Sequence, residues 1–280
     1  MTKFIGIEYG RGCLKTAIPD GPALAPAEVR KMFPDADWTM ITPAPFDPQK
    51  CAQDRFGENF EIQQKIYANT PSNRHIMIGG DHSVNYGHFT AIRDQTPQSD
   101  VCLVYIDAHL DIHTPQSAQI QASGAPHGTN VRALMGMGDE RWLGLQQNAP
   151  ALRPENIFYL GSRSYEPAEI EFIQNNNIYM RTSDQLRSES DLEIAVQEIR
   201  EKIGNRPFVV SLDFDVIDPK YFRDVLVPAG FGITVDAAKY LVHKFRDAHS
   251  FEFVEYAPSD DQPSAQIAHD LIDIVVTAHK

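Results

Sequence analysis

The sequence has few cysteines, few basic residues relative to acidic ones, and no long apolar run. Its three cysteines, Cys13, Cys51 and Cys102, show no metal-ligand spacing, so we expect reduced thiols and a cytoplasmic protein. No apolar run could span a bilayer, and Glu8 interrupts the apolar start, so we expect neither a membrane anchor nor a signal peptide. The net charge of −13 argues against binding to nucleic acid or to an anionic membrane.

Short β-rich runs alternate with segments of helical periodicity along the chain. Eight runs are strand-like: Phe4–Glu8, Thr39–Thr42, His75–Ile78, Val101–Ile106, Ile157–Leu160, Ile178–Met180, Phe208–Leu212 and Phe251–Val254. The fourth run is apolar throughout, as expected for a strand buried on both faces of a parallel sheet. We find no repeat or composition break. The pattern therefore predicts one three-layer α/β/α domain over residues 1–280, with a central, mostly parallel sheet of about eight strands.

Ionisable residues gather where four of these predicted strands end. They are His82 after the third strand, Asp107, His109 and Asp111 after the fourth, Asp213 and Asp215 after the seventh, and Glu255 after the eighth. In open α/β sheets ligands bind beyond the carboxyl ends of the strands. Clustered carboxylates repel one another unless a cation neutralises them. Carboxylates with one or two imidazoles suit Mn²⁺, and less specifically Zn²⁺ or Fe²⁺, and this many ligands favour two ions over one.

A plainer interpretation exists for each segment taken alone. A single Asp-x-Asp at a strand end is more often a helix cap or a solvated turn than a ligand pair. Gly79-Gly80-Asp81 could be an ordinary strand-to-helix turn. The occurrence of three such segments together favours the metal interpretation.

Three unbroken motifs connect the sequence to a known family. They are Gly-Gly-Asp-His-Ser at 79–83, Asp-Ala-His-x-Asp at 107–111 and Ser-x-Asp-x-Asp-x-x-Asp-Pro at 211–219. As a set they resemble the signatures of the ureohydrolases, the family of arginases, agmatinases and formiminoglutamases. The segments 154–161 and 254–258 also resemble arginases. The resemblance implies an arginase-like fold and hydrolysis of a guanidino C–N bond with release of urea.

The same resemblance implies two manganese ions and a role for each ligand. Six residues would hold the ions: His82 and Asp111 on one, His109 and Asp215 on the other, and Asp107 and Asp213 bridging both. Asp111 would also steady the attacking hydroxide, Glu255 would hold the guanidinium, and His127 resembles the family's proton-shuttle histidine. The family usually assembles as trimers or hexamers, so a homo-oligomer is implied as well.

The chain departs from arginases where the substrate head group would bind. His113 stands where arginases usually have an asparagine, and Ala125 replaces an expected polar residue. Ser123 is retained, and Glu166 resembles the carboxylate that meets the substrate α-ammonium. We expect a small guanidino substrate bound by His113, Ser123, Glu166 and Glu255, with L-arginine first. Agmatine, other guanidino compounds and N-formimino-L-glutamate stay open, as do a catalytically silent binding protein and a one-zinc amide hydrolase.

Overall fold

Eight parallel strands form one sheet in the computed structural model, which describes residues 2–13 and 21–279. The strands are β1 Lys3–Ile7, β2 Asp37–Ile41, β3 His75–Ile78, β4 Cys102–Ile106, β5 Ile157–Ser162, β6 Tyr179–Thr182, β7 Phe208–Asp213 and β8 Ser250–Val254. Their order is β2-β1-β3-β8-β7-β4-β5-β6, and every neighbouring pair is parallel. Each predicted run corresponds to a strand, so the predicted sheet is confirmed and is wholly parallel among the described residues.

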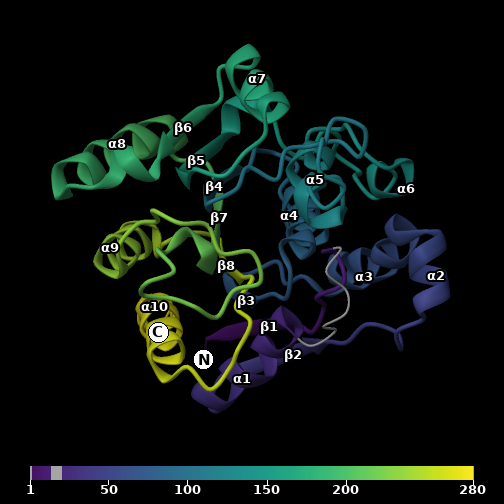
Figure 1. Ribbon diagram of the computed structural model, residues 1–280, viewed down its shortest axis with the longest axis horizontal. Helices are drawn as coiled ribbons and strands as arrows, with labels where there is room; N and C mark the ends of the chain where they lie inside the picture. Colours follow the sequence, from purple (N-terminus) through teal and green to yellow (C-terminus); the bar gives the residue numbers. More distant parts are fainter. Residues whose placement is uncertain (1, 14–20, 280) are drawn as a thin grey trace.

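Helices cover both faces of this sheet (Figure 1). The described ranges contain α1 Ala25–Met32, α2 Pro48–Gln53, α3 Arg55–Asn69, α4 Asn85–Gln95, α5 Pro126–Leu134, α6 Glu140–Leu143, α7 Pro167–Asn175, α8 Glu189–Ile203, α9 Val235–Phe245 and α10 Gln262–Ala278. Helices α1, α8, α9 and α10 share one apolar core with the strands, whereas α3 to α7 bury apolar side chains on the opposite face. None of the described helices is both long enough and apolar enough to cross a membrane.

The strands followed by ionisable residues are neighbours in the sheet. In the order β3-β8-β7-β4 they occupy its centre, although they are far apart in the sequence. Because all four are parallel, their carboxyl ends meet at one edge. The topology therefore converts separate motifs into one site.

The turn after β3 shows why that motif needs a glycine. A Cβ on Gly80 would lie 1.5 Å from the carbonyl oxygen of Tyr9, so no side chain fits there. This close approach lets the Asp81 amide donate to Tyr9 and lets the carbonyl of Gly80 accept a 2.8 Å bond from the Glu255 amide. The glycine thus joins the ends of β3 and β8.

Candidate metal centre

The first ligand group surrounds the imidazole of His82 and is buried. Nδ1 of His82 lies 2.9 Å from Asp107 Oδ2, 3.3 Å from Asp111 Oδ2 and 3.3 Å from Asp213 Oδ2. His82 Nε2 lies 2.9 Å from the hydroxyl of Ser211. A proton on Nε2 would be donated to Ser211 and would leave Nδ1 free as a ligand atom.

The second ligand group faces solvent more openly. Nδ1 of His109 lies 2.8 Å from Asp215 Oδ2 and 3.6 Å from Asp107 Oδ1. The His109 side chain is 24% exposed, whereas that of His82 is 1% exposed. Asp107 belongs to both groups, with one carboxylate oxygen toward each histidine. This sharing is the geometry expected of a carboxylate between two cations.

Short local turns aim the two central carboxylates. Asp107 accepts a 2.6 Å bond from the amide of His109, and Asp213 accepts a 2.7 Å bond from the amide of Asp215. Each aspartate therefore orders the turn that presents the next ligand two residues later. In both segments, therefore, the first aspartate accepts a bond that orders a turn and is also a candidate metal ligand.

The unpartnered atoms in this cluster fit a metal site. His82 Nδ1 and Asp107 Oδ2 are buried and have no hydrogen-bond partner. An unsatisfied buried polar atom costs about 1–3 kcal/mol, so such pairs rarely persist without a ligand. The donors are carboxylate oxygens and imidazole nitrogens, which suit divalent manganese, zinc or iron. The donor set therefore fits a pair of divalent ions.

The shifted pKa values of the ligand groups also favour bound cations. Burial, followed by repulsion from Asp107, raises the pKa of Asp111 to about 7. Burial and the neighbouring Asp215 raise the pKa of Asp213 well above its ordinary value. Although burial opposes it, the nearby carboxylates of Asp107 and Asp213 raise the pKa of His82. A cation that replaced these protons would relieve the repulsion among the carboxylates.

Two of the site residues have strained backbones. Asp111 has φ 50° and Glu255 has φ 62°, both in the left-handed region that non-glycine residues rarely adopt. Such conformations cost about 1–3 kcal/mol and cluster at functional sites. Both residues line the cavity at the ends of the central strands.

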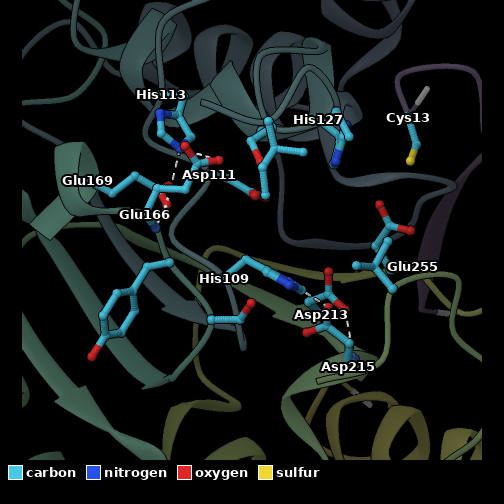
Figure 2. Close-up of a pocket in the computed structure, with 17 residues that line it drawn as sticks. Cys13, His109, Asp111, His113, His127, Glu166, Glu169, Asp213, Asp215 and Glu255 are labelled. Atoms are coloured by element: carbon cyan, nitrogen blue, oxygen red, sulfur yellow. Dashed lines mark hydrogen bonds and ion pairs between the residues drawn. The ribbon is translucent and has the colours of Figure 1, made fainter. Parts of the chain in front are cut away.

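A cavity of about 340 Å³ opens over the ligand groups (Figure 2). Nine of the eleven predicted site residues line it: His109, Asp111, His113, Ser123, His127, Glu166, Asp213, Asp215 and Glu255. The other two, His82 and Asp107, are buried. The structure thus brings every predicted site residue to one place.

At one end of this cavity His113 lies between two glutamates, as the dashed lines in Figure 2 show. Its Nε2 lies 3.3 Å from Glu169 Oε2 and 3.5 Å from Glu166 Oε1. Glu166 also accepts a 2.6 Å bond from the amide of Gln119. Glu166 Oε1 is buried without a hydrogen-bond partner. The Glu166 carboxylate therefore places an unsatisfied acceptor at this end of the cavity.

Glu255 and His127 lie on another side of the cavity (Figure 2). The Glu255 carboxylate accepts a 2.9 Å bond from the amide of His82, and burial raises its pKa well above the ordinary value. His127 Nδ1 lies 3.1 Å from the carbonyl oxygen of Gly12. Burial lowers the pKa of His127 to about 4, so its ring is neutral near pH 7. A neutral imidazole can take up a proton.

Three residues of the site were not singled out from the sequence. Ser211 holds the ring of His82, Glu169 contacts His113, and the Tyr105 hydroxyl donates a 2.8 Å bond to Asp111. Ser211 and Tyr105 each precede a ligand by two positions on their strand, so the period of two could have identified them. Glu169 follows Glu166 by one helical turn at the start of α7.

Comparison with known proteins identifies the family. The model of the arginase family matches residues 21–278. The chain belongs to the arginase family. Arginase of Eremothecium gossypii is 31% identical over 206 residues, which are 72% of this chain and 50% of that protein. Arginase of Entamoeba histolytica is 30% identical over 215 residues, which are 73% of this chain and 69% of that protein.

Solved arginase structures share the fold. Arginase of Entamoeba histolytica in complex with L-ornithine superposes with a TM-score of 0.84 at 22% identity, covering 98% of this chain and 97% of that chain. The alignments to the two curated arginases span half to about two thirds of their length.

Proposed function

We propose that this chain hydrolyses the guanidino C–N bond of L-arginine, releasing urea and L-ornithine, with two manganese ions. The observation that carries the proposal is the pair of ligand groups joined through the buried Asp107, with His109, Asp111 and Asp215 lining the cavity. His82 and Asp111 would hold one ion and His109 and Asp215 the other. Asp213, beside His82, would bridge them with Asp107.

When bound, the two ions would neutralise the carboxylates and make a water molecule acidic enough to attack at neutral pH. Glu255 would pair with the substrate guanidinium in a charge-assisted bond and hold its carbon over the ligand groups. Asp111 would orient the attacking water through a carboxylate oxygen. These roles use residues that line one cavity.

The remaining residues would move protons and bind the head group. His127 lines the cavity with its Nδ1 held against the carbonyl oxygen of Gly12, so its ring would pass a proton from the reaction to the departing amine. At the other end, Glu166 Oε1 would accept from the α-ammonium, with Ser123 and His113 beside it. A substrate with cations at both ends fits this distribution of carboxylates.

Urea release by manganese-loaded protein tests the proposal, with L-arginine, agmatine, 4-guanidinobutyrate and guanidine side by side. We expect urea from L-arginine, and at least about 10²-fold lower kcat/KM in Glu255→Gln with its manganese content retained, because a charged partner is lost. Release of urea from another of these guanidines, and not from L-arginine, would make that compound the substrate instead. No urea from any of them, with hydrolysis of N-formimino-L-glutamate, would replace the proposed reaction.

A further inference from the structure

Tyr105 contacts two proposed ligands of the same ion. It lies on β4, and no part of it is exposed. Its ring stacks on the imidazole of His82, with centroids 4.4 Å apart and planes 5° apart. Its hydroxyl donates a 2.8 Å bond to Asp111 Oδ2, the oxygen that faces His82 Nδ1 at 3.3 Å.

We propose that Tyr105 is the positioning residue of the first ligand group, fixing the His82 ring and the Asp111 carboxylate for one ion. This inference rests on the proposed metal function. Asp111 needs such support because its backbone is strained, with φ 50°, and no backbone amide of the described residues donates to its carboxylate. Groups that orient metal ligands in this way typically change metal affinity about 10–100-fold.

The second ligand group has no comparable support. Within the described ranges no aromatic ring stacks on His109, whose side chain is 24% exposed. Its Nδ1 contacts Asp215, which is positioned by the backbone amide of Ala108 at 3.2 Å. Loss of the Tyr105 hydroxyl should therefore weaken binding of the ion in the first ligand group and leave binding of the other ion unchanged.

Tyr159 provides a matched control. It is as buried as Tyr105, and the two rings lie edge to face with centroids 5.3 Å apart. Its hydroxyl donates 2.8 Å to the carbonyl oxygen of Leu110 and to no proposed ligand. Replacing either tyrosine by phenylalanine removes one buried hydroxyl and keeps the ring. Only the Tyr105 change removes a bond to a ligand.

The test measures Mn²⁺ affinity by the electron paramagnetic resonance signal of free manganese, together with thermal unfolding. Measurements in a His109→Asn background leave the first ligand group alone, so its ion is measured separately. We expect Tyr105→Phe to lower the affinity for that ion about 10–100-fold and Tyr159→Phe to leave the affinity unchanged.

Unchanged affinity in Tyr105→Phe, or an equal loss in both variants, would overturn the positioning role. Wild-type protein that binds no manganese would overturn the proposed function, and this inference with it. That failure is distinct because it appears before any substitution is made. Retained urea release at saturating manganese in Tyr105→Phe would agree with a role in ligand placement.

Discussion

The two ligand groups share Asp107 but are built differently. The His82 imidazole and Asp107 are buried at the ends of the central strands, with Asp111 and Asp213 of the same group toward the cavity. Ser211 and Tyr105 contact ligands of this group. The His109 group lies at the cavity, and its histidine is partly exposed. The first group therefore resembles part of the core, whose ligands are fixed by packing. The second has the access to solvent and substrate that chemistry requires.

Breaking the shared residue should have the largest effect. Asp107→Asn removes a charge that both groups use and keeps the shape of the side chain. We expect kcat for urea release to fall at least about 10³-fold, because several kcal/mol of transition-state stabilisation depend on both ions. Metal content should fall below two ions per chain. Elemental analysis and urea release measure the two effects.

Asp218→Asn is the control for that change. Asp218 follows the same strand end as Asp213, and its carboxylate accepts a 3.0 Å bond from the amide of Lys220. It belongs to neither ligand group. We expect near-normal metal content and urea release. An equal defect in both variants would indicate general disruption rather than loss of a shared ligand.

Replacing the two histidines separately sharpens the comparison. His109→Asn should lose one ion and lower kcat about 10²-fold or more, with a small change in stability because the side chain is partly exposed. His82→Asn should lose the other ion and also lower the melting temperature of the metal-free protein, because it leaves a buried gap beneath Tyr105. Calorimetry of metal-free variants measures this difference. Equal melting temperatures would contradict the asymmetry.

Much of this arrangement could be predicted from the sequence, for identifiable reasons. The strands are strongly apolar and the candidate ligands lie in short motifs, so both can be recognised in the sequence alone. Contacts that core residues make with distant parts of the chain cannot be recognised in this way. Tyr105 resembles any buried aromatic residue until its hydroxyl is placed against Asp111. His88 and Glu252 likewise form a buried pair between α4 and β8, although they are 164 positions apart.

His113 shows the same limit at the substrate end. Its position after Asp111 predicted contact with substrate, and it does line the cavity. Yet its Nε2 faces Glu166 and Glu169, and its Nδ1 lies 3.1 Å from the hydroxyl of Ser117. The two glutamates, Glu166 just before α7 and Glu169 in its first turn, come from a separate part of the chain. Its direct contact with substrate stays a prediction.

The smallest expected effect is the pH dependence of stability that arises from the first ligand group. Burial raises the pKa of Asp111 to about 7 in metal-free protein, above its unfolded value near 4. Its proton therefore stabilises the folded state at low pH, and that stability is lost as pH rises through about 7. Manganese requires the deprotonated carboxylate, so binding strengthens over the same range.

The melting temperature of manganese-loaded protein should therefore exceed that of metal-free protein by a margin that widens from pH 5 to pH 8. One proton per pH unit corresponds to about 1.4 kcal/mol, which is a few degrees for a protein of this size. His127, with its pKa lowered to about 4, should contribute to both forms and largely cancel from the difference. In Asp111→Asn the widening should shrink, because one of the titrating carboxylates is gone. A margin that stays constant in the wild type would mean that protons and manganese do not compete at the buried group.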